Sequence, residues 1–102
     1  MAKRKKKLSP IRPGEILLEE FMKPLGLSAN KLALELRVPS NRVVAIVGGK
    51  RAISADTALR LARYFNTSAD FWVNLQARYD LQRAEDAFAA AIAREVQPRD
   101  AA

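Results

Sequence analysis

The sequence of 102 residues contains no cysteine and no histidine. Without cysteine there is no disulfide framework, no thiolate nucleophile and no thiolate metal ligand. Without histidine, the side chain that most often acts as a general base or binds a metal is missing as well. We therefore expect no catalytic residues, no metal site and no cofactor, and we interpret the chain as a binding protein rather than an enzyme.

Long apolar runs are also missing. None approaches the roughly 20 residues that a membrane-spanning helix needs. The basic start is followed by a proline-containing stretch, residues 9–13, and not by the apolar core of a signal peptide. The sequence therefore predicts a cytoplasmic protein that does not enter a membrane, and its length suits one small domain.

The net charge of +7 is unevenly distributed. Residues 1–52 hold 12 lysines and arginines against 4 acidic residues, whereas residues 53–102 hold 6 against 7. A basic half beside a nearly neutral half indicates a polyanionic partner that is contacted from one side. Residues 3–7 are all basic. This run either adds to such a contact or is a solvated tail that keeps the protein soluble.

The beginning of the chain predicts an arm followed by a helix. Residues 1–12 should form a flexible basic arm, because a charge run with two nearby prolines buries little apolar surface. Pro13 suits the first turn of a helix. Pro24 disfavours helical geometry at Lys23, and Gly26 is a typical residue just beyond a helix end.

Serine residues mark the starts of later helices. Ser28, Ser54 and Ser68 each precede apolar residues at helical spacing, so each is expected to cap a helix. One more helix begins at Pro39 or Ser40 and ends at a pair of glycines.

The last helix should continue through the alanine-rich stretch 87–93 to about Val96. No convincing alternation of apolar and polar residues predicts a strand. The predicted fold class is all-α, with five helices and an extended C-terminal helix. We expect residues 13–79 to form one domain and residues 80–102 to form a helical extension with a frayed end.

The spacing between Ala29 and Gly48 is typical of a helix-turn-helix. Two short helices that cross at a steep angle need a small residue at the crossing, and Ala33 meets that need. Apolar residues hold the pair together, and the candidates are Leu32, Leu36, Val38, Val43 and Ile46. The second helix is then free to present its other face to the major groove of DNA.

Several short stretches occur in the order and spacing of a known family: Pro13–Glu15, Pro24–Ser28, Val38–Arg42, Gly49–Arg51, Ile53–Ala62 and Phe71–Gln76. The helix-turn-helix segment resembles the phage-repressor (Cro-type) superfamily. The run from Ile11 to Gln76 is similar, more narrowly, to the HigA-type antitoxins of bacterial toxin–antitoxin systems.

The turn departs from the superfamily pattern at one position. Arg37 stands where a glycine with left-handed backbone geometry is usual. A non-glycine residue with that geometry costs about 1 kcal/mol. Either the turn keeps this geometry at that cost, or it adopts another one.

The resemblance makes the helix after the turn the candidate reading helix. Its base-reading candidates are Ser40, Asn41, Arg42 and Ala45. Asn41 can pair bidentately with adenine, Arg42 can reach guanine or phosphate, and Ala45 can contact a thymine methyl group. The alternatives are a capping role for Asn41 and an ordinary surface charge for Arg42.

Polar and basic residues around the two helices are candidates for phosphate contacts: Ser28, Asn30, Lys31, Arg37, Lys50 and Arg51. The start of a helix attracts anions, and such contacts position a protein on DNA without reading its sequence. The alternative for each is ordinary surface charge.

Apolar and aromatic residues recur at helical spacing in the last helix: Phe71, Trp72, Leu75 and Tyr79. Such a pattern indicates packing in the core or at a dimer interface more often than a ligand pocket.

The resemblance implies a sequence-specific transcriptional repressor that binds double-stranded DNA at a pseudo-palindromic operator as a homodimer. It further implies an antitoxin that controls its own operon and neutralises a partner toxin of the mRNA-nuclease type. Two alternatives stay open: a stand-alone regulator without a toxin, and a protein-interaction module that has lost DNA binding.

Overall fold

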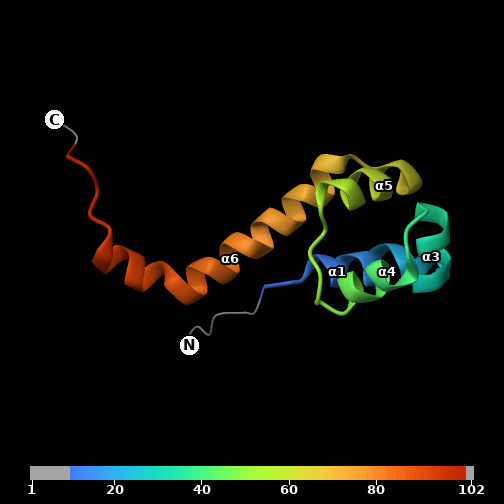
Figure 1. Ribbon diagram of the computed structural model, residues 1–102, viewed down its shortest axis with the longest axis horizontal. Coiled ribbons are helices and arrows are strands. Elements are labelled where there is room, and N and C mark those ends of the chain that lie inside the picture. The colour runs from blue at the N-terminus through green and yellow to red at the C-terminus, as the bar shows by residue number, and fades with distance from the viewer. Residues whose placement is uncertain (1–9, 101–102) are drawn as a thin grey trace, which may run out of the picture.

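The computed structural model describes residues 10–100. All regular structure within this range is helical, and the first of the five helices consists of three consecutive segments. The elements are α1 (Pro13–Ile16), η1 (Leu17–Met22), α2 (Lys23–Leu25), α3 (Ala29–Leu36), α4 (Ser40–Val47), α5 (Ala55–Phe65) and α6 (Ala69–Glu95). The predicted all-α fold class is confirmed. In Figure 1 the first four helices and the start of α6 gather into one body, from which the rest of α6 projects.

The first helix continues past the point where the sequence predicted a break. Lys23 has helical geometry, with φ −62° and ψ −48°, so the expected effect of Pro24 on it is wrong. The preceding segment η1 is π-helical, and its wider turn leaves room where the proline ring would clash with the carbonyl of the previous turn. The helix ends at Gly26 as predicted, with left-handed geometry.

The three predicted serine caps are confirmed. The Oγ atoms of Ser28, Ser54 and Ser68 accept hydrogen bonds from backbone N–H groups three residues later, at 3.0, 3.3 and 3.1 Å. Each bond satisfies a donor that would lack a partner at a helix start. The three helices therefore begin where their serines predict.

Trp72 lies at the centre of the core and is 0% exposed. Its indole N–H donates to the Thr67 hydroxyl at 2.8 Å, so the buried polar atom has a partner. Phe21 and Phe71 contact its ring, with ring centroids 4.8 and 4.9 Å away. Apolar residues from the other four helices, and Ile53 from the segment between α4 and α5, complete the core: Leu17, Met22, Leu32, Ala33, Leu36, Val43, Ile46, Ala58 and Leu61.

Gly14 allows the first helix to approach α4 closely. A Cβ atom added at Gly14 would overlap the backbone carbonyl oxygen of Ile46. No residue with a side chain fits there without moving one helix. Gly14, in the Pro13–Glu15 stretch, therefore determines how closely α1 packs against α4.

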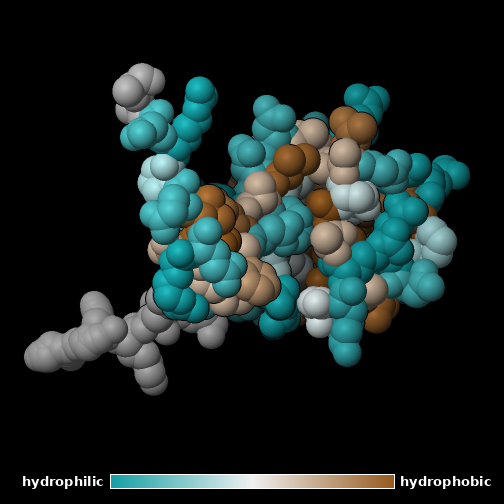
Figure 2. All heavy atoms as spheres, turned by 60° about the vertical axis from the view of Figure 1, so that its left-hand side comes forward, coloured by the Kyte–Doolittle hydropathy of each residue, from teal (hydrophilic) through white to brown (hydrophobic). Residues whose placement is uncertain are grey.

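Helix α6 is continuous across the expected domain boundary at residue 80. Apart from the half-buried Ala91, all its residues from Leu81 onward are exposed, and we call residues 81–95 the distal segment. In Figure 2, where this end of the molecule comes forward, brown apolar side chains lie among teal ones. Within residues 10–100, no helix is both long and apolar enough to cross a membrane.

Candidate nucleic-acid interface

The turn between α3 and α4 keeps the left-handed geometry that the family pattern requires. Arg37 has φ 61° and ψ 45°. Its N–H donates to the Leu34 carbonyl at 3.2 Å, and the N–H of Val38 donates to the Ala33 carbonyl at 3.0 Å. These bonds satisfy the carbonyls at the end of α3. Ala33 is buried at the helix crossing, as its small size predicts.

Helix α4 turns one face to the core and the opposite face to solvent. Val43 and Ile46 are buried, while Ser40 and Asn41 are exposed and Ala45 is half-buried. Pro39 occupies the N-cap position, so Asn41 has no capping role here. Three of the four base-reading candidates therefore share one accessible face.

Val44 belongs to the same accessible face, although sequence reasoning missed it. Its side chain is 57% exposed. It lies one helical turn after Ser40 and outside the buried stripe, which is the signal that could have found it. An apolar side chain at this place can contact a thymine methyl group.

Arg42 points away from that face. Its Nη1 donates to Oδ2 of Asp56 at 2.7 Å, and its side chain is only 22% exposed. Its Nε atom is buried and has no hydrogen-bond partner among the described residues. The guanidinium is thus neither an ordinary surface charge nor free to meet a base in this conformation.

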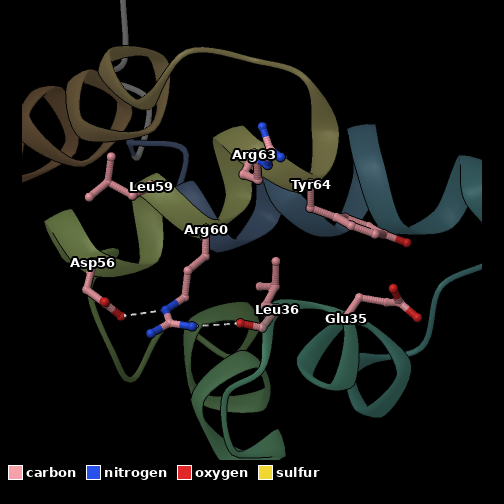
Figure 3. Close-up of a pocket in the computed structure, with 7 residues that line it drawn as sticks. All are labelled: Glu35, Leu36, Asp56, Leu59, Arg60, Arg63 and Tyr64. Carbon is pink, nitrogen blue, oxygen red and sulfur yellow. Dashed lines mark hydrogen bonds and ion pairs between the residues drawn. The ribbon is translucent and has the colours of Figure 1, made fainter.

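Asp56 and Arg60 extend this contact to α3. The Nε atom of Arg60 donates to the same Asp56 oxygen at 3.0 Å, and its Nη1 donates to the Leu36 carbonyl at 2.9 Å. We call Arg42, Asp56, Arg60 and the Leu36 carbonyl the arginine–aspartate bridge. Figure 3 shows Arg60 reaching both Asp56 and Leu36 beside a hollow of about 580 Å³. Hydrogen bonds from Arg60 and then from Arg42 lower the pKa of Asp56 below its ordinary value of 3.8.

The six phosphate-contact candidates are all exposed: Ser28, Asn30, Lys31, Arg37, Lys50 and Arg51. Two of them already have intramolecular partners. The Ser28 hydroxyl caps α3, and Lys31 pairs with Glu35 at 3.0 Å. Arg37 forms no ion pair within residues 10–100.

A second basic cluster lies where α4 ends. A hollow of about 180 Å³ is lined by four basic residues, Arg12, Lys50, Arg51 and Arg83, and by one acidic residue, Asp80. The Nη2 atom of Arg12 donates to the Val47 carbonyl at 3.5 Å, near the negative end of the α4 dipole. Arg12 and Arg83 were not candidates from the sequence, because 71 residues separate them along the chain.

The four residues predicted for the core or a dimer interface fall into different environments. Trp72 is fully buried, Leu75 and Tyr79 are half-buried, and Phe71 is 38% exposed although its ring contacts Trp72. Trp72 belongs to the core of the single chain.

A helix-turn-helix family model matches residues 18–72. The chain belongs to this family, and its helix-turn-helix is of the phage-repressor (Cro) type. It is 53% identical over 81 residues to virulence-associated protein I of Dichelobacter nodosus, covering 79% of this chain and 75% of that protein.

Two solved structures have the same fold over nearly their whole length. The antitoxin HigA of Pseudomonas aeruginosa, solved with the higBA promoter, is 47% identical, with a TM-score of 0.87 over 89% of this chain and 99% of that one. An addiction module antidote protein of the HigA family from Coxiella burnetii is 50% identical, with a TM-score of 0.85 and the same coverage. The predicted resemblance to HigA-type antitoxins is confirmed.

Proposed function

We propose that this protein is a transcriptional regulator that binds operator DNA through α4 and also serves as an antitoxin. The observation that carries the proposal is the accessible face of α4, which presents Ser40, Asn41 and Val44 beside a basic part of the chain. The likeness to an antitoxin solved with promoter DNA supports it, because the similarity extends over 99% of that chain.

We infer that Asn41 reads adenine and that Val44 and Ala45 contact thymine methyl groups. The asparagine amide N–H can donate to N7 of adenine while its oxygen accepts from the N6 amino group, which gives discrimination of about 1–3 kcal/mol against a wrong base. Ser40 can donate or accept at a neighbouring base. Arg42 is not among these base contacts, because Asp56 holds its guanidinium.

Arg37, Lys50 and Arg51, with Ser28, Asn30 and Lys31, are our proposed phosphate contacts. Arg12 and Arg83 join this set, since they line the same hollow as Lys50 and Arg51. Four basic side chains outnumber the one carboxylate, Asp80, around this hollow, so its net positive charge favours an anion. Such contacts give affinity that falls steeply with salt concentration.

The proposed regulator acts as a homodimer on a pseudo-palindromic operator. A two-fold dimer would place its two reading helices about 34 Å apart, one turn of DNA. The distal segment of α6 offers a surface for a second copy, with an apolar stripe of Leu81, Phe88 and Ile92 that Val96 continues just beyond the helix end. A hollow on the same segment is lined mostly by apolar residues that include Ala84, Ala89 and Ala93. In this dimer Phe88 of one copy would enter the hollow of the other, because a two-fold interface pairs the same surface of both copies.

Sedimentation analysis tests this dimer. Phe88→Glu should convert the dimer to a monomer, whereas Leu59→Glu on α5, a matched change of an exposed apolar residue, should leave it dimeric. A monomeric wild type, or a dimeric Phe88→Glu variant, would contradict the proposed interface.

The antitoxin role implies a toxin of the mRNA-nuclease type whose gene lies next to the gene of this protein. Co-expression with its chromosomal neighbour should yield a complex in which the nuclease activity is suppressed. If the neighbour encodes no such protein, the stand-alone regulator is the better description.

DNA binding is tested by fluorescence anisotropy with DNA from just upstream of the gene, at two salt concentrations. Wild type should bind this DNA tightly and with steep salt dependence, and Asn41→Ala should lose the preference for it. Asn74→Ala, an exposed asparagine on α6, is the matched control. Weak binding that is equal on random DNA would favour the interaction module that has lost DNA recognition.

A further inference from the structure

Three elements of the helix-turn-helix unit meet at the arginine–aspartate bridge. The Leu36 carbonyl ends α3, Arg42 lies in the first turn of α4, and Asp56 lies in the first turn of α5. One carboxylate oxygen, Oδ2 of Asp56, accepts from both arginines, at 2.7 and 3.0 Å. The bridge therefore runs without interruption from the end of α3 through α5 to the start of α4.

The bridge connects two helices, α4 and α5, that otherwise pack little against each other. Helix α4 packs against α3 and α1, but it has little direct packing with α5. The bond from Arg42 to Asp56 is thus a main tie between the reading helix and the helix beside it. Because Arg42 is in the first turn, this tie acts at the end of α4 that carries Ser40 and Asn41.

We propose that Asp56 is a positioning residue for DNA recognition: it holds Arg42 and thereby fixes the angle at which the start of α4 meets the major groove. The inference rests on the proposed function, since it concerns how that same face is oriented. Asp56 itself touches no base; it acts through Arg42, and Arg60 anchors it to the end of α3. A displacement of about 1 Å at the start of α4 is enough to misalign side chains that must meet base edges.

Electrostatics alone predicts a different effect of removing this carboxylate. Asp56→Asn removes a negative charge near the proposed DNA surface, and added positive charge strengthens binding to any sequence. A positioning role instead predicts that binding to the operator weakens relative to random DNA. Electrostatics therefore leaves the ratio of the two dissociation constants unchanged, whereas a positioning role lowers it.

The chain contains a matched control for Asp56. The stretch Ser54–Asp56 at the start of α5 repeats as Ser68–Asp70 at the start of α6. Both aspartates lie in the first turn of a serine-capped helix and favour it through the helix dipole. Asp70 forms no ion pair within the described chain, so Asp70→Asn changes the charge and the helix start but breaks no bridge.

The test measures the ratio of dissociation constants for random and operator DNA in four proteins. Asp56→Asn should lower this ratio about tenfold, comparable to the loss of one base-pair contact. Asp70→Asn should leave it unchanged, and Asp56→Glu should restore most of it. An unchanged ratio in Asp56→Asn, or an equal loss in Asp70→Asn, would overturn the proposal.

Amide hydrogen exchange in the free proteins separates this proposal from the proposed function. Asp56→Asn should speed exchange in α4, residues 40–47, while Asp70→Asn should not. If wild type shows no preference for the operator, the proposed function fails. The exchange result then decides alone whether Asp56 holds α4: faster exchange supports that role, and unchanged exchange overturns it.

Discussion

The body of the molecule and the distal segment of α6 are both helical, but they are stabilised differently. In the body, buried side chains from the other four helices share one core with Trp72. In the distal segment the large apolar residues, such as Phe88 and Ile92, are exposed. The body should therefore fold through its own core, whereas the distal segment depends on helix propensity and, in our proposal, on a second copy. The same element, α6, thus serves as core at its start and as an interaction surface at its end.

The largest contrast is expected between Trp72→Ala and Phe88→Ala. Trp72→Ala should cost about 3–5 kcal/mol of unfolding free energy, because it leaves a large cavity in a small core. Phe88→Ala should change the stability of the monomer by about 0.5 kcal/mol or less. Chemical denaturation at low protein concentration measures both, with circular dichroism for the tryptophan variant. Similar losses for the two variants would show that the distal segment packs on the body.

Gly14→Ala should cause the next largest loss of folding stability. The added methyl group meets the backbone of Ile46, so α1 and α4 must separate at a cost of about 1–3 kcal/mol. At Gly48 an added Cβ would lie 3.3 Å from the Val44 carbonyl oxygen, which is tight but does not force helices apart. Thermal unfolding should show a much smaller loss for Gly48→Ala. Equal melting temperatures for the two variants would argue against the close approach.

Arg37→Gly should stabilise the body while weakening DNA binding. Glycine adopts the left-handed geometry at φ 61° without strain, which is a gain of up to about 1 kcal/mol. The substitution also removes a proposed phosphate contact, so the salt dependence of binding should become shallower. Asn66→Gly, at φ 58°, is the control with a smaller gain, because asparagine tolerates this geometry. A destabilised Arg37→Gly variant would mean that the Arg37 side chain makes stabilising contacts in the wild type.

The smallest expected effect is on how stability depends on pH. The folded-state pKa of Asp56 is lowered by its bonds to Arg60 and Arg42, so its contribution to stability is fully present above the ordinary value of 3.8. That contribution is lost as the pH falls through the lowered pKa. Asp56→Asn should therefore flatten the loss of stability below about pH 4, and replacing both arginines by glutamine should do the same. An unchanged acid profile in these variants would show that the bridge adds nothing to stability.

Local signals in the sequence predicted most of the fold. The serine caps at Ser28, Ser54 and Ser68 fixed helix starts, because each cap involves only neighbouring residues. The left-handed geometry at Arg37 was one of two that the sequence left open, and it came from the family pattern rather than from a local signal. The effect of Pro24 was not predictable in this way, because a π-helical turn before it absorbs the clash.

Contacts between distant residues escaped prediction. Arg42 had the residue type and position of a DNA contact, but its partner Asp56 lies 14 residues later and on another helix. The fit of Gly14 against Ile46 spans 32 positions. No periodicity or local propensity encodes such pairs. The accessible face of α4 could therefore be predicted in outline, but the contacts that hold α4 in place could not.

The most direct test of DNA reading by α4 is a base-pair scan of the operator with wild type and Asn41→Ala. Each base pair is substituted in turn, and the dissociation constant is measured for both proteins. Asn41→Ala should lose discrimination at one adenine–thymine pair in each half-site, about one turn of DNA apart, and keep it elsewhere. A scan that is the same for both proteins would contradict the claim that this face of α4 reads DNA.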